Sequence, residues 1–218
     1  MIDFKGYFQW GPFVANYKIE DDTVKELLKR GRKEKASSAN KRLAGLLTDQ
    51  RLYSEDTMQY FIKWFEPYYQ DYISRNVNYA TGQKYDKSIH SSSFSLIDLW
   101  VNFMKEKEYN PIHTHSGHLS WVIFLKTPNL DEEYKNFEGT GMGPGVLSFY
   151  YGEDSEWAIS SYKYRPVVGE MWIFPAKVRH GVVPYSTKGE RISVSGNLFL
   201  NPPNITSSSI FKKSNNEI

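Results

Sequence analysis

Residues 94–104 read FSLIDLWVNFM, and this stretch opens the series of short runs that decides the fold. Five further apolar or alternating runs follow it, separated by Gly, Pro, Asn and Ser: LSWVIFLK (119–126), GVLSFYYG (145–152), SSYKYRP (160–166), EMWIFPA (170–176) and RISVSGNLFL (191–200). Short runs of this kind, with turn signals and no helical pattern between them, are typical of antiparallel sandwiches and barrels. The sequence therefore predicts a mainly β protein built around a jelly roll.

The residues before this series predict supporting helices. Apolar and polar positions alternate over residues 1–20, which predicts an opening strand, and Asp22 or Thr23 is expected to cap the helix that follows. A second helix begins near Ser54, where aromatic and aliphatic residues recur at three- and four-residue spacings. Pro67 interrupts this pattern and should kink or split the helix, because proline removes one backbone donor. We expect the second helix to pack against the sheet.

Length and composition fit one domain. The chain has 218 residues, 40% of them hydrophobic and 24% charged, and a chain of this size buries a sizeable core without disulfides. We expect a single domain over residues 1–203, with the N-terminal strand and helices in 1–93 and the jelly-roll core in 94–203. Residues 204–218 are polar and are predicted to form a tail.

Composition also excludes several classes of function. The absence of Cys excludes disulfide scaffolds, thiolate metal sites and cysteine nucleophiles. Lys and Arg number 27 against 25 Asp and Glu, and the resulting net charge of +2 makes nucleic acid an unlikely partner. No apolar run approaches the roughly 20 residues of a membrane span and no signal peptide is visible, so we expect a cytoplasmic protein without a membrane partner. Edge strands of such barrels often pair, which makes a homodimer one expectation.

Three of the five histidines lie within six positions, in NPIHTHSGHLSW (110–121). Residues two apart on a strand point to the same face, so His113 and His115 can aim both imidazoles at one point. His180 can close this site from another strand. Neutral imidazole binds Fe, Zn, Cu and Ni. The alternative is that these are surface or hydrogen-bonded core histidines, but three of them on two strands favour a metal site.

The spacing around His180 is informative. Gly169, Pro175 and His180 stand in the order G-x5-P-x4-H, which resembles the second signature of the cupin-like jelly rolls. The first cupin signature is half present in His113-x-His115, whereas the acidic ligand expected a few positions later is missing.

The last run carries a charge in an unusual position. In ERISVSGNLFL (190–200), Arg191 shares one strand face with Ser193, Ser195 and Asn197, while the other face is apolar. A guanidinium fork beside serine hydroxyls suits a carboxylate, because the fork donates to both oxygens. The alternative is an Arg on the solvent face of a barrel strand. The position of Arg191 eleven residues after His180 favours the carboxylate pocket.

Together these motifs resemble the Fe(II)/2-oxoglutarate-dependent oxygenases, which have a double-stranded β-helix fold. Residues 94–200 are similar to 2-oxoglutarate oxygenases found in bacteriophages of marine cyanobacteria. The resemblance implies that His113, His115 and His180 hold Fe(II) and are the catalytic metal ligands. His115 stands where the family has Asp or Glu, so either the iron has three histidine ligands, or the register differs and His118 is the alternative ligand.

The same resemblance implies 2-oxoglutarate as co-substrate and hydroxylation of a small-molecule or peptide substrate. Arg191 and Ser193 would bind the far carboxylate of 2-oxoglutarate, and Asn102, on the strand before the ligands, is expected to donate a hydrogen bond into the site. Four aromatic residues are candidates for the substrate pocket or the barrel core: Trp100, Trp121, Tyr150 and Trp172.

Two other functions compete with this one. A cupin-type metal enzyme that uses no 2-oxoglutarate explains the histidines but leaves Arg191 and Ser193 without a role. A non-catalytic jelly-roll scaffold that has lost its metal is favoured by the histidine at position 115.

Overall fold

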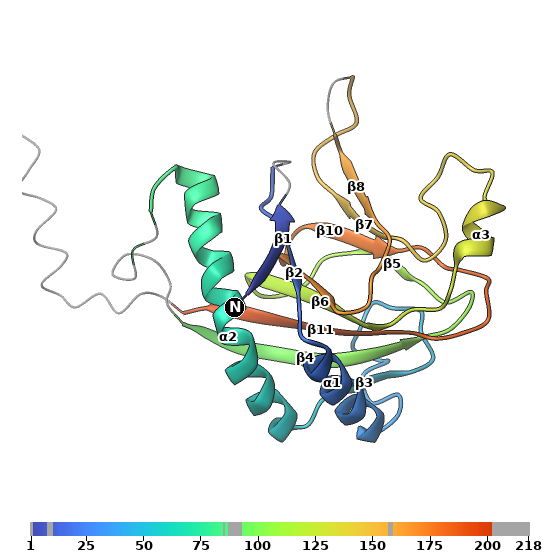
Figure 1. Cartoon of the computed structure of the whole chain (residues 1–218), viewed down its shortest axis with the longest axis horizontal. Coiled ribbons are helices and arrows are strands. Elements are labelled where there is room, and N and C mark those ends of the chain that lie inside the picture. The colour runs from blue at the N-terminus through green and yellow to red at the C-terminus, as the bar shows by residue number, and fades with distance from the viewer. Residues whose placement is uncertain (1, 8–10, 85, 87–92, 157–158, 202–218) are drawn as a thin grey trace, which may run out of the picture.

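The computed structural model describes residues 2–7, 11–84, 86, 93–156 and 159–201 (Figure 1). Two antiparallel sheets face each other, and the two longer helices lie outside one of them. The predicted tail, residues 204–218, lies outside the described residues, as does His90. Within the described part of the chain, no helix has the length and apolar character needed to cross a membrane.

The described residues form eleven strands and three helices. The strands are β1 (Asp3–Tyr7), β2 (Ala15–Lys18), β3 (Gln50–Leu52), β4 (Phe94–Met104), β5 (Asn110–His113), β6 (Leu119–Lys126), β7 (Leu147–Tyr150), β8 (Ser161–Tyr164), β9 (Glu170–Pro175), β10 (Arg179–Val182) and β11 (Arg191–Leu200). The helices are α1 (Asp21–Lys33), α2 (Glu55–Thr81) and α3 (Asp131–Lys135).

The strand order confirms the predicted jelly roll. The major sheet has seven strands in the order β1-β2-β9-β6-β11-β4-β3, and the minor sheet has four in the order β5-β10-β7-β8. From β4 onward the chain passes repeatedly between the two sheets, because β4, β6, β9 and β11 lie in the major sheet and β5, β7, β8 and β10 in the minor one. All strand pairs are antiparallel. This winding is the double-stranded β-helix.

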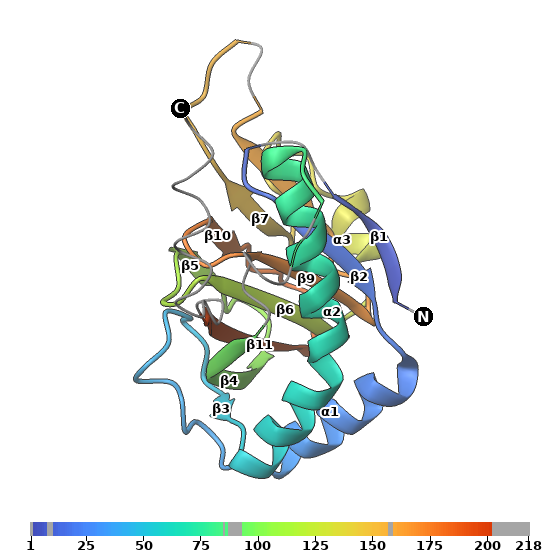
Figure 2. The ribbon, with the colours of Figure 1, turned by 90° about the vertical axis from the view of Figure 1, so that its left-hand side faces the viewer.

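The major sheet has an apolar layer on each face. On its outer face Trp121 of β6 stacks on Phe61 and Phe65 of α2, with ring centroids 5.3 and 4.7 Å apart. Figure 2 shows α2 in front of this sheet, with α1 below it. On the inner face a second cluster, which includes Phe124 and Phe149, fills the space between the two sheets. The helices therefore support the outer face and leave the inner face free to build a cavity.

Three strands match their predicted bounds, and the N-terminal elements differ from prediction. The strands β4, β6 and β11 span the expected residues, while β5 and β10 are short and were not separately predicted. The expected strand over residues 1–20 is instead two strands, β1 and β2, which pair antiparallel. The chain contains Gly11 and Pro12 between them, and these residues favour a reversal.

Both long helices also correct an expectation. α1 begins at Asp21 with Glu20 as its N-cap, and neither Asp22 nor Thr23 caps it. The two acidic residues in its first turn favour this start, since they lie near the positive end of the helix dipole. α2 is one helix through Pro67 and is not split. Buried aromatic residues on both sides of Pro67 pack against the sheet, and this packing outweighs the single lost backbone hydrogen bond.

Candidate active site

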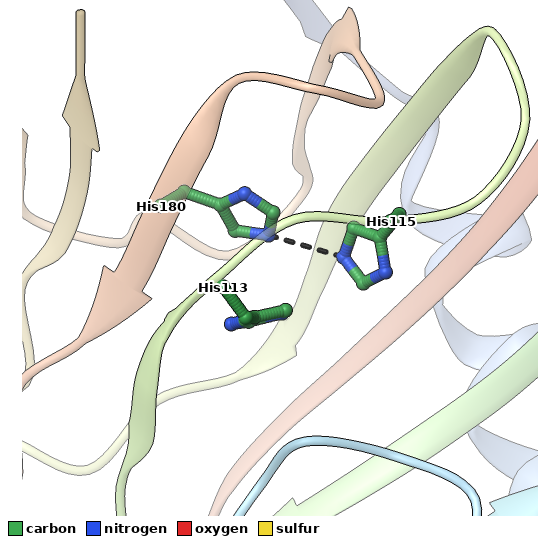
Figure 3. Close-up of side chains that lie close together, drawn as sticks. All are labelled: His113, His115 and His180. Carbon is green, nitrogen blue, oxygen red and sulfur yellow. Dashed lines mark hydrogen bonds between the residues drawn. The ribbon is translucent and has the colours of Figure 1, made fainter.

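The structure brings together three of the five histidines. His113 ends β5 and lies opposite His180 of the neighbouring strand β10. His115 lies two residues beyond the end of β5, where its backbone N–H donates to the carbonyl of Ala176 at 2.8 Å. The potential ligand nitrogens of His113, His115 and His180 all lie within 4.8 Å of one another (Figure 3). We call these three residues the histidine cluster.

Backbone carbonyls fix the ring orientation of two members of the cluster. Nδ1 of His113 lies 2.7 Å from the carbonyl oxygen of Pro111, and Nδ1 of His180 lies 2.9 Å from that of Val178. A carbonyl only accepts hydrogen bonds, so each Nδ1 carries the proton and each Nε2 keeps a lone pair. This arrangement is the usual outer support of metal-bound imidazole.

The spacing of the nitrogens and the ionisation of the rings both suit a metal. Nε2 of His115 and Nε2 of His180 are 3.1 Å apart. Two nitrogens bound about 2.1 Å from one ion at right angles would be separated by about 3.0 Å. Burial, followed by the charges of neighbouring histidines, lowers the pKa of His115 to about 2. Burial likewise lowers the pKa of His180 to about 3 and also lowers the pKa of His113. The cluster is therefore neutral at physiological pH, as ligands must be.

The structure corrects two details of the predicted site. His115 lies past the strand end, so a chain turn and not a shared strand face directs its ring into the cluster. His118, the alternative ligand, lies outside the cluster, because its Nδ1 accepts a hydrogen bond from the backbone of Leu200 at 2.9 Å. Its ring also packs on Phe199, with centroids 5.2 Å apart.

No carboxylate of the described residues joins the cluster. The acidic residues of α3 are used elsewhere: Asp131 pairs with Arg165, and Glu133 accepts hydrogen bonds from Ser186 and Thr187. The candidate metal site is therefore made of three imidazoles.

Arg191 lines the same cavity as the histidine cluster. This cavity has a volume of about 240 Å³ and is lined by the histidine cluster and by Arg191, Ser193 and Ser195 on the inner face of β11. Arg191 is only 4% exposed, and among the described residues no carboxylate pairs with it. Its Nη1 donates to the carbonyl of Gly145 at 3.2 Å, and its guanidinium lies 5.0 Å from the centre of the Phe124 ring.

Burial lowers the pKa of Arg191 to about 10, so the group remains charged at neutral pH. A buried cation without a counter-ion is costly. A ligand carboxylate in the cavity would supply the missing anion.

A chain of polar side chains lies beside Arg191. Gln50 of β3 donates through Nε2 to Oδ1 of Asn102 at 2.8 Å, and Nδ2 of Asn102 donates to Oγ of Ser193 at 3.4 Å. All three side chains are buried and line the cavity, and Oε1 of Gln50 has no partner among the described residues. Sequence reasoning found Asn102 and Ser193 but missed Gln50, which lies in a three-residue strand that carries no local signal.

Of the four aromatic candidates, only two line the cavity. Trp100 does so, and its ring lies 5.6 Å from that of His115. Trp121 also borders the cavity, but its ring stacks on α2. Trp172 belongs to the core between the sheets, and Tyr150 does not border the cavity.

Solved structures with a similar fold include two prolyl hydroxylases and HygX. The structure is similar to a prolyl-4-hydroxylase from Pseudomonas putida, with 13% identity, a TM-score of 0.51, and coverage of 86% of this chain and 92% of that one. It is similar to the viral collagen prolyl hydroxylase of Paramecium Bursaria Chlorella virus-1, with 13% identity, a TM-score of 0.52, and coverage of 86% and 96%. HygX from Streptomyces hygroscopicus, solved with nickel, 2-oxoglutarate and hygromycin B, has 8% identity, a TM-score of 0.54, and coverage of 89% and 84%. At these identities the likeness concerns the fold alone.

The sequence of the jelly-roll core is similar to that of a known family. Residues 98–197 match the family model described as "Putative 2OG-Fe(II) oxygenase". A comparison with curated proteins gives no match. This match covers 100 of the 218 residues. Together with the histidine cluster it indicates a non-haem dioxygenase whose metal is Fe(II) and whose co-substrate is 2-oxoglutarate.

Proposed function

We propose that the histidine cluster holds the Fe(II) of this dioxygenase and that Arg191 binds the far carboxylate of 2-oxoglutarate. The observation that supports this most strongly is that one cavity is lined both by three neutral imidazoles and by a buried guanidinium without a carboxylate partner. Each group alone has a structural alternative. Their common cavity favours a metal and an anion bound side by side.

The donor set fits ferrous iron. Three imidazoles with Nδ1 of two rings held by carbonyls suit a divalent first-row metal. Bound iron would activate oxygen so that one oxygen atom enters a C–H bond of the substrate and the other enters succinate, with release of carbon dioxide. The neutral imidazole of His115 stands in place of the usual carboxylate. The iron site would therefore carry one more positive charge than a site with two histidines and one carboxylate.

The remaining residues position the co-substrate. Arg191 would donate two N–H groups to the far carboxylate, with Ser193 adding a hydroxyl donor. Asn102 already donates to Ser193 and accepts from Gln50, so this chain holds the serine hydroxyl in place. The apolar ring of Phe124 against the guanidinium excludes water and strengthens the ion pair.

An anaerobic titration tests the proposed site. Fe(II) and 2-oxoglutarate are added separately and together, and the visible spectrum is recorded. We expect a charge-transfer band only when both are present, lost in His180→Ala and retained in the control His118→Ala, because His118 lies outside the cluster. Metal binding without the band would indicate a cupin-type enzyme that uses no 2-oxoglutarate, and absence of metal binding would indicate a non-catalytic scaffold.

Partners and boundaries remain predictions. We propose a small-molecule or peptide substrate, no nucleic-acid partner and, from the edge strands, a possible homodimer. A single domain over residues 1–203 and a cytoplasmic location also stay predictions. Size-exclusion chromatography with light scattering tests whether the protein is a homodimer, and cell fractionation tests its location.

A further inference from the structure

An ion pair lies at the opposite end of the cavity from Arg191. Arg42, in the segment between α1 and β3, donates through Nη2 to Oδ1 of Asp98 on β4 at 3.1 Å. Both residues line the cavity, and their side chains are 59% and 29% exposed. The cavity therefore holds a cation and an anion at one end and an unpaired cation at the other.

The Arg42–Asp98 pair leaves most of its hydrogen-bonding capacity unused. Only one of the five N–H groups of the Arg42 guanidinium donates, and it donates to one oxygen of the Asp98 carboxylate. Neither group makes another side-chain hydrogen bond among the described residues. An ion pair this exposed contributes little to stability, so the two groups can turn toward a ligand at small cost.

Asn197 adds a buried polar group without a partner. It lies directly opposite Asp98 in the pairing of β11 with β4, is 5% exposed and lines the cavity. Its Oδ1 has no hydrogen-bond partner within the described residues. A buried acceptor in this state is unfavourable, and a ligand that brings N–H donors would satisfy it.

Trp100 connects this end of the cavity to the histidine cluster. It lies two residues from Asp98 on the same inner face of β4, a spacing of roughly 7 Å along a strand. Its ring is 5.6 Å from the ring of His115. A ligand anchored on Asp98 can therefore extend along Trp100 and reach the cluster.

We propose, resting on the function assigned above, that the substrate is a free α-amino acid. Its ammonium group binds Asp98 and Asn197, its carboxylate binds Arg42, and its side chain extends along Trp100 toward the histidine cluster. The cavity of about 240 Å³ also has to hold the co-substrate and is smaller than the roughly 300–1,000 Å³ of drug-sized sites. An internal peptide residue has neither a free ammonium nor a free carboxylate, so Asp98 and Arg42 would stay bonded only to each other.

The position of these anchors also specifies the reaction. The hydroxyl group is added to a side-chain carbon and not to Cα, because the Arg42–Asp98 pair holds the two charged groups of Cα and only the side chain extends past Trp100 to the cluster. One C–H bond is replaced by C–OH with one atom of O₂. The second atom enters the succinate formed as 2-oxoglutarate loses carbon dioxide, so 2-oxoglutarate supplies the two further electrons.

Calorimetric binding to the full chain tests the substrate class. The protein is loaded with redox-inert Zn(II), with and without 2-oxoglutarate, and the standard L-amino acids are titrated one at a time. We expect at least one to bind, and its N-acetyl derivative and its carboxamide each to bind at least about tenfold more weakly. Asp98→Asn should remove most of the discrimination against the N-acetyl derivative, and Arg42→Gln most of that against the carboxamide.

A matched control distinguishes the effect of the Arg42–Asp98 pair on binding from a general effect of surface charge. Asp131→Asn removes another exposed acid that pairs with an arginine outside this cavity, and it should leave amino-acid binding unchanged. If 2-oxoglutarate binds but no amino acid binds at about 10 mM, the substrate class is wrong while the assigned function stands. Equal binding of an amino acid and its blocked derivatives, or binding of a peptide alone, would also overturn it. Failure of 2-oxoglutarate itself to bind would overturn both.

Discussion

Replacing Arg191 by Met separates a ligand-binding role from a structural one. The guanidinium is buried, donates to the carbonyl of Gly145 and has no carboxylate partner among the described residues. In the ligand-free protein, Met removes an uncompensated buried charge and loses about one hydrogen bond, worth about 1 kcal/mol. We therefore expect the free energy of unfolding of Arg191→Met to be unchanged or higher.

The effect on 2-oxoglutarate binding should be large. Truncating one partner of a buried, hydrogen-bonded charge pair costs about 2–5 kcal/mol. At 1.4 kcal/mol per factor of ten, this cost corresponds to an increase in the Kd for 2-oxoglutarate of between about 30-fold and several thousandfold. Calorimetric titration of the Zn(II)-loaded protein measures the Kd, and urea unfolding measures stability without ligand.

Arg51→Met is the matched control. Arg51 is also an arginine beside an aromatic ring, but it makes two hydrogen bonds with Asp49, at 2.9 and 2.5 Å, and stacks on Phe103. Its replacement should lower the free energy of unfolding and leave the Kd for 2-oxoglutarate unchanged. An Arg191→Met protein that unfolds more easily and still binds 2-oxoglutarate normally would refute the role given to the buried cation.

Three further outcomes follow from the site. His115→Ala should lower Fe(II) affinity at least tenfold, by about 1.4 kcal/mol or more, in an anaerobic metal titration, while His118→Ala should have no effect on it. Asn102→Ala should raise the Kd for 2-oxoglutarate about fivefold, because one hydrogen bond of about 1 kcal/mol to Ser193 is lost; an unchanged Kd in calorimetry would contradict this positioning role. The pKa of His180 is about 3 in the folded protein against about 6.5 when unfolded, so the unfolded chain takes up the proton first. The contribution of His180 to the stability of the metal-free protein should decrease by up to about 1.4 kcal/mol per pH unit as the pH falls from 6.5 to 3, and His180→Gln should reduce the pH dependence measured by urea unfolding by this contribution.

Long strands with a clear alternation were predictable from the sequence. β11 shows this best: Arg191, Ser193 and Asn197 share the inner face as expected, because a strand alternates its side chains whatever the surrounding fold. β10 was not predicted, because its four residues, RHGV, are too few and too mixed to show an alternation.

The candidate site shows the same division between local and distant information. The histidine cluster was found from residue type and spacing, although His115 reaches it from a turn and not from the strand. Gln50 and Arg42 were missed, because each enters the cavity from the segment around β3, and only tertiary contacts bring that segment to β4. The sequence predicted that Pro67 kinks or splits the second helix; the split does not occur, because the packing of α2 against the sheet holds it together.

Anomalous diffraction from anaerobic crystals grown with Fe(II) and 2-oxoglutarate tests the central claim most directly. We predict one iron about 2.1 Å from a ring nitrogen of each of His113, His115 and His180, with the far carboxylate of 2-oxoglutarate on Arg191. Iron bound elsewhere, or a carboxylate that leaves the guanidinium of Arg191 unpaired, would contradict the account.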